Sequence, residues 1–264
     1  MSESQTYAGR TALVTGASSG IGAGLARALA ARGADLVLVA RRAAALEDLA
    51  AQVRAEHGRR VDVVPADLAV PGAGRDLHTR VLELGLHVDL LVNNAGFGVS
   101  GPVAGADADA LVAQVPLNCS AVVDLTTRFL PAMVARRSGA VVNVASVAAL
   151  QPVPGMAVYA ATKAFVLSFT EALWAEQRGS GVRILAVCPG PTDTPFFEVA
   201  GEDALGGLPR RTVDDVVATT LRALASGGPS VVDGPLFTAL GVVAKVLPRR
   251  VVAQVSGIVA RPKR

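Results

Sequence analysis

The chain has 264 residues, 51% of them hydrophobic, which is enough to bury the core of one large domain or at most two small ones. Two isolated cysteines and three scattered histidines argue against a disulfide-stapled secreted fold and against a metal site, so we expect a reduced, cytoplasmic protein. The formal net charge of +3 comes from the C-terminus, because the last twenty positions hold six basic residues and no acidic residue follows Asp233.

Short runs rich in Val and Leu alternate along the chain with longer Ala-rich stretches that have helical spacing. Strands are predicted over 11–15, 35–40, 61–64, 88–92, 140–145, 182–187 and 230–233. Helices are predicted over 21–32, 43–57, 73–85, 107–116, 118–137, 157–178 and 213–226. The strand runs lack polar alternation, which is typical of parallel strands covered on both faces. The pattern predicts the α/β class, with residues 1–234 forming a single-domain doubly wound parallel sheet of the Rossmann type and helices on both faces.

Ligands of such a sheet bind beyond the carboxyl ends of the strands, so the residues that follow each strand are candidates for a site. Gly16, Gly20 and Gly22 lie between the first strand and the first helix. Glycine permits positive φ and close approach of a pyrophosphate, and the helix N-terminus supplies amides and a partial positive charge. The sequence therefore predicts a phosphate-binding turn of a dinucleotide site.

The second strand ends in Ala40-Arg41-Arg42. A site that prefers NAD has Asp or Glu here, bonded to the ribose 2′-hydroxyl. No carboxylate is present to repel a 2′-phosphate, and a charge-assisted hydrogen bond from arginine contributes about 1.5–3 kcal/mol. We expect NADP to be preferred over NAD by about ten- to a hundredfold or more, with Arg41 favoured over Arg42 as the partner. The alternative is that both guanidinium groups are simply solvated.

Tyr159 and Lys163 lie four residues apart in a predicted helix, which puts both polar heads on one face. Alone, such a pair usually forms an amphipathic rim, but Ser146 follows the fifth strand thirteen residues before Tyr159. A positive charge within about 4–6 Å favours a phenolate by about 1–3 pK units. We therefore expect Lys163 to lower the pKa of Tyr159 toward neutrality, so that the phenol serves as a general acid or base.

Together these motifs resemble the short-chain dehydrogenase/reductase family over almost the whole chain to about residue 233. The resemblance is carried by TGxxxGxG from Thr15 to Gly22, the acidic Asp67, NNAG at 93–96, Asn118, Ser146, YxxxK at Tyr159 and Lys163, and PG at 189–190.

What the resemblance implies is NADP(H)-dependent hydride transfer. Tyr159 would be the acid and base, Ser146 would bond the substrate oxygen, Lys163 would bond the nicotinamide ribose, and Asn118 would hold a water. Cofactor contacts are implied at Gly16, Ser18, Ser19, Gly20, Ile21, Gly22, Arg41, Asp67, Leu68, Asn94, Ala95, Gly96, Tyr159, Lys163, Pro189, Gly190 and Thr192. Pro116 departs from the family pattern two residues before Asn118, so the helix there either begins or is kinked.

Apolar side chains in the loops after strands four to six predict a hydrophobic ketone, aldehyde or secondary alcohol as substrate, with residues 194–209 as a mobile lid. These side chains are Phe97, Val99, Val147, Leu150, Val153, Met156, Phe196, Phe197 and Val199. Each Phe could equally pack the lid against the core. An alternative function is a non-catalytic NADP(H)-binding sensor or scaffold protein.

Residues 235–264 form a basic C-terminal extension that is predicted to contain two short apolar helices broken at Pro248. The extension could cover the substrate pocket, pack against another subunit or lie on an anionic membrane surface. Its apolar run is interrupted by Lys245 and is too short to span a bilayer. The extension has no aromatic residue after Phe237, which argues against nucleic-acid binding. The family resemblance suggests a homodimer or homotetramer.

Overall fold

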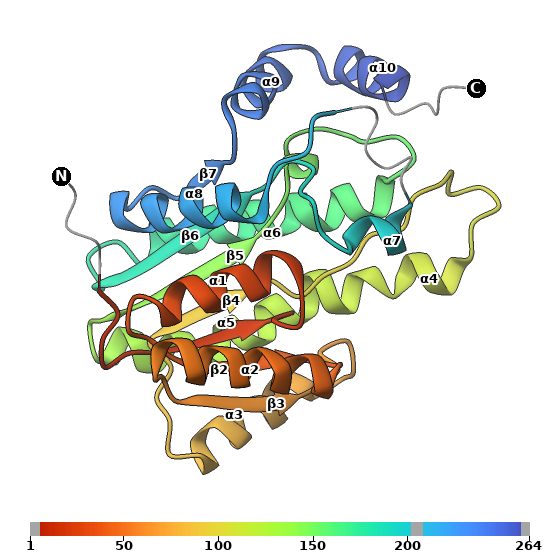
Figure 1. Cartoon of the computed structure of the whole chain (residues 1–264). Coiled ribbons are helices and arrows are strands. Elements are labelled where there is room, and N and C mark those ends of the chain that lie inside the picture. Colours follow the sequence, from red (N-terminus) through yellow and green to blue (C-terminus); the bar gives the residue numbers. More distant parts are fainter. Residues whose placement is uncertain (1–5, 202–207, 260–264) are drawn as a thin grey trace.

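The computed structural model describes residues 6–201 and 208–259, whose strands form one parallel sheet (Figure 1). The strands are β1 Thr11–Thr15, β2 Asp35–Ala40, β3 Val61–Pro65, β4 Leu90–Asn93, β5 Gly139–Val144, β6 Val182–Cys188 and β7 Ser230–Val232. Their order in the sheet is β3-β2-β1-β4-β5-β6-β7, and every neighbouring pair is parallel. The order reverses between β1 and β4, so the predicted doubly wound Rossmann fold is confirmed.

Helices cover both faces of the sheet (Figure 1). On one face lie α1 Gly20–Ala30, α2 Ala43–His57 and α8 Val213–Ser226, and on the other lie α3 Ala73–Glu83, α5 Ala121–Ala135 and α6 Ala157–Glu176. Successive strand residues serve opposite cores: Val14 packs with α1 and α8, while Leu13 packs with α3 and α5. This two-sided burial is why the strands read as continuous apolar runs.

The helical run that contains Pro116 continues through it as a π-helical turn. The structure places α4 at Ala108–Val112, a π-helical turn η1 at Pro116–Ser120, and α5 directly after it. Pro116 has no N–H to continue the α-helical ladder, and the Ala121 N–H bonds to the Pro116 carbonyl five residues back. Of the two alternatives left open by the sequence, a new helix beginning at Pro116 is therefore not observed, and the regular α-helix is interrupted there by a π-helical turn.

Residues Ala108–Ala135 are the only described helical run that is long and apolar enough to cross a membrane. Leu125, Phe129 and Met133 of this run are buried in the core beneath the sheet. The length and apolar composition of this helical run are therefore explained by its position as a core helix.

A row of buried hydrogen bonds crosses the sheet from α5 to α6. Asn93 Nδ2 donates to Thr126 Oγ1 at 3.1 Å and to Asn143 Oδ1 at 2.9 Å. Asn143 Nδ2 in turn donates to Thr170 Oγ1 at 2.9 Å. Asn93 and Asn143 are partners in the β4–β5 register, so these amides join the two helices through adjacent strands.

The C-terminal extension consists of α9 Pro235–Val246 and α10 Arg249–Val259, which lie outside the helix layers (Figure 1). Pro248 separates them, as the sequence predicts. Asp233, two residues before the start of α9, is completely buried. Its carboxylate accepts hydrogen bonds from Arg211 Nε at 2.9 Å and Thr219 Oγ1 at 2.6 Å, which ties the start of the extension to α8.

Candidate active site

A cavity of about 740 Å³ opens at the carboxyl ends of the strands. It runs from the glycine turn past the end of β2 to Tyr159, and onward beneath α9 and α10. Its lining includes these residues singled out from the sequence: Gly16, Ser18, Ser19, Gly20, Ile21, Arg41, Asp67, Leu68, Asn94, Ala95, Gly96, Ser146, Tyr159, Lys163, Pro189, Gly190 and Thr192. The two predicted site residues that do not line it are Gly22 and Asn118.

The glycine turn is packed tightly against the loop after β4. Gly16 has φ +66, and a Cβ there would lie 2.7 Å from Asn94 Nδ2. A Cβ on Gly22 would collide with the carbonyl oxygen of Gly16. Gly22 therefore serves the close approach of α1 to β1 and does not face the cavity.

Thr15 joins the segments that follow β1 and β4, the two strands between which the strand order reverses. Its hydroxyl donates to the carbonyl oxygen of Val92 at 3.2 Å and accepts from the N–H groups of Asn94 at 2.9 Å and Ala95 at 3.0 Å. The β1 turn and the β4 loop are thus fixed to each other, and both face the cavity.

The two arginines at the end of β2 differ in their contacts. Arg42 Nη2 donates to Ser18 Oγ at 3.1 Å and to the Ser18 carbonyl at 3.3 Å, across the glycine turn. Arg41 is exposed and lines the cavity. Both residues line the cavity beside the glycine turn, so the sequence-based preference for Arg41 remains a prediction.

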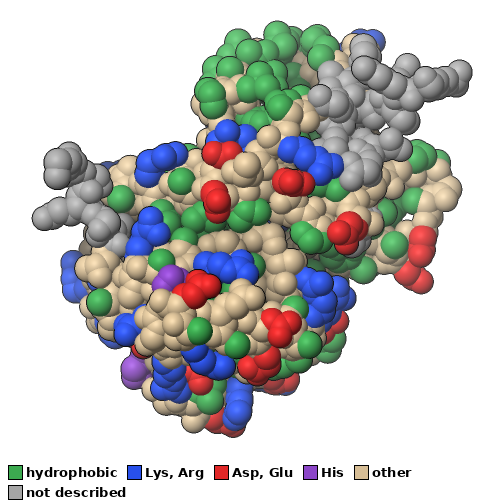
Figure 2. Space-filling model, in the orientation of Figure 1, with side chains coloured by type: hydrophobic (Ala, Val, Ile, Leu, Met, Phe, Trp, Pro, Cys, Tyr) green, Lys and Arg blue, Asp and Glu red, His purple; other side chains and the backbone are tan. Residues whose placement is uncertain are grey.

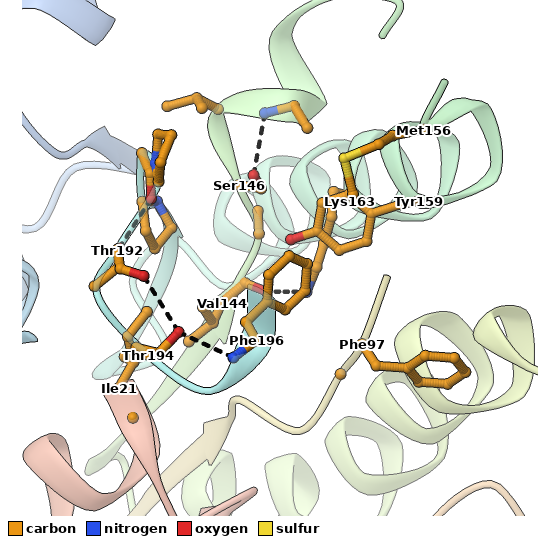
Figure 3. A pocket seen from close by; sticks show the side chains of 18 of the residues that line it. Ile21, Phe97, Val144, Ser146, Met156, Tyr159, Lys163, Thr192, Thr194 and Phe196 are labelled. Carbon is orange, nitrogen blue, oxygen red and sulfur yellow. Dashed lines mark hydrogen bonds between the residues drawn. The ribbon is translucent and has the colours of Figure 1, made fainter. Parts of the chain in front are cut away.

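Tyr159, Lys163 and Ser146 come together at the middle of the cavity (Figure 3). Tyr159 and Lys163 are buried on one face of α6, as their spacing predicts, and the ammonium lies 5.8 Å from the centre of the phenol ring. Lys163 Nζ donates to the carbonyl oxygen of Val144 at 2.7 Å. Ser146 Oγ, at the end of β5, accepts from the Ala148 N–H at 3.1 Å.

Burial, and not the charge of Lys163, has the largest effect on the pKa of Tyr159, so the expected lowering of that pKa is wrong. Burial raises the pKa of Tyr159 to about 12, and the hydrogen bond with Ser146 only partly opposes this shift. Burial also lowers the pKa of Lys163 to about 8. Loss of water is the largest cause of both pKa shifts, and the ammonium is directed to the Val144 carbonyl. At neutral pH the phenol therefore carries its proton.

Asn118 lies behind the cavity wall, on the π-helical turn. Its Oδ1 accepts from the Phe97 N–H at 3.1 Å, and its Nδ2 donates to the Phe97 carbonyl at 2.9 Å and to Thr162 Oγ1 at 3.0 Å. The side chain thus joins the loop after β4 to α6, and the implied water-holding role remains a prediction.

Thr162 was not identified from the sequence. Its hydroxyl donates to the Tyr159 carbonyl at 2.8 Å and accepts from Asn118, so it joins η1 to α6. A buried threonine in an Ala-rich helix has no local signal that would reveal this partner.

The substrate side of the cavity is apolar. Seven of the predicted lining residues are present in it: Phe97, Val147, Leu150, Val153, Met156, Phe196 and Phe197. Phe196 opens the short helix α7 Phe196–Ala200, and its ring centre lies 5.3 Å from that of Tyr159. Val99 is not part of the lining. The side chain of Val199 and residues 202–207 of the predicted lid lie outside the described residues.

The C-terminal extension forms the far wall of the cavity, which the sequence left as one of three alternatives. The lining residues from it are Phe237, Leu240, Gly241, Val243, Ala244, Leu247, Val252, Val255 and Ser256. Ser256 Oγ donates to the Pro152 carbonyl at 2.8 Å, and a Cβ on Gly241 would lie 2.7 Å from Leu150 Cδ1. The extension therefore covers the pocket by contact with the loop after β5.

The residues present fit a nicotinamide dinucleotide. One continuous cavity joins a glycine turn that opens α1, two arginines at β2 and a carboxylate at β3 to a buried phenol and ammonium. A doubly wound sheet with this site defines a dinucleotide-dependent oxidoreductase.

Comparison with known proteins agrees with this class. The short chain dehydrogenase family model matches residues 10–204. An uncharacterised oxidoreductase of Staphylococcus epidermidis is 32% identical over 212 residues, which cover 80% of this chain and 90% of the relative. The chain belongs to the short-chain dehydrogenase/reductase family.

Two solved structures extend the likeness to three dimensions. A short-chain dehydrogenase from Sphingobium yanoikuyae in complex with NADPH has a TM-score of 0.80 and 35% identity, covering 90% of this chain and 96% of its own. A bulky-bulky ketone specific alcohol dehydrogenase from Comamonas testosteroni has a TM-score of 0.75 and 31% identity, covering 91% and 95% respectively.

Proposed function

We propose that the protein is an NADP(H)-dependent carbonyl reductase that acts on bulky hydrophobic ketones or aldehydes and, in reverse, on the corresponding secondary alcohols. The observation that carries the proposal is the buried Tyr159 between two differently lined parts of one cavity. On one side of the phenol lie the glycine turn and the arginines, and on the other lies an apolar pocket.

Each catalytic side chain has a role that follows from its place. The nicotinamide supplies the hydride when it is bound. Tyr159 donates its proton to the substrate oxygen, and Ser146 Oγ bonds the same oxygen as negative charge develops on it. Lys163 is held by the Val144 carbonyl, where it can bond the nicotinamide ribose and favour the phenolate left after proton transfer.

The lining of the pocket supports an apolar substrate. Among the described lining residues, the charged side chains are Arg41, Arg42, Asp67, Lys163 and Glu198. The cations among them lie at the cofactor end or beside Tyr159, so no cation on the far wall is available to pair with a substrate carboxylate. The ketone specificity named for the Comamonas testosteroni relative is in keeping with this substrate class.

The test is NADPH and NADH oxidation against a panel of hydrophobic ketones and aldehydes, with Tyr159→Phe beside the wild type. Tyr7→Phe is a matched control, because it removes the only other phenol, which is also buried but lies outside the cavity. We expect turnover with NADPH that Tyr159→Phe abolishes and Tyr7→Phe preserves. NADPH binding without turnover by the wild type would instead favour the alternative, a non-catalytic sensor or scaffold.

We also infer a cytoplasmic homodimer or homotetramer assembled through α5 and α6. Phe165, on α6, is 44% exposed and stacks on Phe169, which supports an apolar contact surface there. Sedimentation of the wild type and Phe165→Asp tests this assembly, since a charge on the contact surface would dissociate it.

A further inference from the structure

Exposed apolar side chains are concentrated on α9 and α10. Within the described residues, eight of the fourteen large hydrophobic side chains that are exposed belong to these two helices or, in the case of Leu247, to the junction between them. They are Leu236, Leu240, Val242, Val243, Val246, Leu247, Val251 and Val255. Figure 2 shows hydrophobic side chains gathered over α9 at the top of the molecule. The other six are spread over α3, α4, α6 and loops, so the concentration is specific to the extension.

Contact with the pocket accounts for only part of this surface, which we call the C-terminal apolar surface. On α9 only Phe237 and Gly241 are buried. Val242 and Val246 are 59% and 80% exposed and do not line the cavity. A helix that is apolar around its circumference belongs in an apolar medium, and contiguous exposed patches of this kind mark interaction sites.

The charged side chains of α9, α10 and the junction between them are all positive. Lys245, Arg249 and Arg250 are exposed at the junction of α9 and α10. The sequence adds Arg261, Lys263 and Arg264 at the C-terminus and no acidic residue after Asp233. A second copy packed on this surface would bring cations against cations, which is unfavourable in a desolvated contact. Charge complementarity therefore selects an anionic partner.

An anionic lipid bilayer supplies both features that the surface requires. Its headgroups attract basic side chains, and its acyl boundary accepts exposed aliphatic groups. With 12 residues α9 is about 18 Å long, shorter than the ~30 Å hydrocarbon core, so it can lie in the interface but cannot span it.

We propose that α9 and α10 dock the protein on the surface of an anionic lipid bilayer. Leu240, Val243, Leu247 and Val255 both line the cavity and are at least 40% exposed, so docking places this apolar wall of the pocket at the lipid surface. A hydrophobic substrate dissolved in the bilayer would then reach the pocket from the membrane. This last consequence rests on the proposed function, whereas the docking itself does not.

The test is flotation of the full-length chain with vesicles of phosphatidylcholine alone and with vesicles of phosphatidylcholine and phosphatidylglycerol in equal amounts. We expect binding to the anionic vesicles that weakens with added salt, and little binding to the neutral ones. Each basic side chain near such a surface strengthens binding by about fivefold, so Arg249→Glu with Arg250→Glu should weaken it by at least about 25-fold.

Matched substitutions distinguish this surface from a general effect of charge. Val242→Asp with Val246→Asp should abolish flotation, because both side chains point away from the pocket. Val70→Asp and Arg75→Glu change equally exposed residues elsewhere and should bind as the wild type does. Unchanged thermal denaturation and NADPH binding verify that each variant is folded.

Three results would overturn the proposal. One is equal binding of the wild type and the Val242→Asp, Val246→Asp variant. In another, the wild type does not float with anionic vesicles but forms an oligomer that the Val242→Asp, Val246→Asp variant dissociates, which would assign the surface to a contact with a second copy. In the third, the wild type does not float but is retained on poly-glutamate in a salt-sensitive manner, which would assign the surface to an acidic protein partner. None of these readouts uses turnover, so a failure of the proposed function leaves the test of docking intact.

Discussion

Asp233 offers the sharpest test of how the C-terminal cover is held. The carboxylate is completely buried and accepts hydrogen bonds from Arg211 Nε at 2.9 Å, Arg211 Nη2 at 3.3 Å and Thr219 Oγ1 at 2.6 Å. Asp233→Asn preserves the shape of the side chain but removes its charge and places an N–H₂ group where one oxygen accepted. Because α9 begins two residues later, the same substitution loosens the attachment of the cover.

The magnitude follows from the burial of each partner. Breaking a fully buried ion pair costs about 3–5 kcal/mol, but Arg211 is 30% exposed and also pairs with Asp215, so we expect about 2–3 kcal/mol. For 264 residues the unfolding entropy is about 0.55 kcal/mol/K, so the midpoint of thermal denaturation should fall by about 4–5 °C.

Glu83→Gln is the control, since it removes one charge from an exposed pair with Arg80 and should shift the midpoint by less than about 1 °C. The assay is thermal denaturation followed by circular dichroism, combined with KM for the best hydrophobic substrate. A denaturation midpoint for Asp233→Asn equal to that of Glu83→Gln would refute the reasoning. A lowered midpoint with unchanged KM would show that Asp233 stabilises the chain without positioning the cover.

Three further predictions concern the site. Gly22→Ala places a Cβ against the Gly16 carbonyl, so it should lower the free energy of unfolding by at least about 1–3 kcal/mol and weaken NADPH binding. In the control Gly228→Ala the added Cβ meets no atom within 4 Å, so both the denaturation curve and the cofactor titration should be unchanged. The pKa of Tyr159 is raised from 10.0 to about 12, so its phenolate absorbance should develop around pH 12 in the folded protein and around pH 10 in the denatured one. The free energy of unfolding should therefore fall as the pH rises from 10 to 12. Ionisation near pH 10 in the folded wild type that is missing from Tyr159→Phe would contradict this prediction. Arg41→Ala should lower the preference for NADPH over NADH, measured as the ratio of kcat/KM with each cofactor, by at least about tenfold. A larger loss of this preference in Arg42→Ala would assign the 2′-phosphate contact to Arg42 instead.

The strands and most helices could be predicted because their signals are local. Apolar runs and the glycine turn give β1 and β2 with the predicted bounds. At Pro116 the sequence showed that the regular helix must be interrupted, but the choice between a new helix and a kink depends on packing of α4 and α5 in the finished fold.

The parts of the site that escaped prediction depend on contacts between distant segments. The charge of Lys163 was expected to dominate the pKa of Tyr159, yet desolvation by burial dominates it. The amide of Asn118 is occupied by Phe97 and Thr162, which no spacing along the chain reveals. Likewise, apolar composition allowed three positions for the extension, and only its contacts with Pro152 and Leu150 place it over the pocket.

The paired amides of Asn93 and Asn143 have a consequence for the accuracy of the site. If β5 slipped by one residue along β4, a valine would face Asn93, and each amide left without a partner would cost about 1–3 kcal/mol. The same slip would carry Ser146 about 3.3 Å along the strand, out of reach of an oxygen bonded to Tyr159. The amide pair thus disfavours misaligned sheets in which the hydroxyls of Ser146 and Tyr159 could not both bond the substrate oxygen in the reaction proposed above.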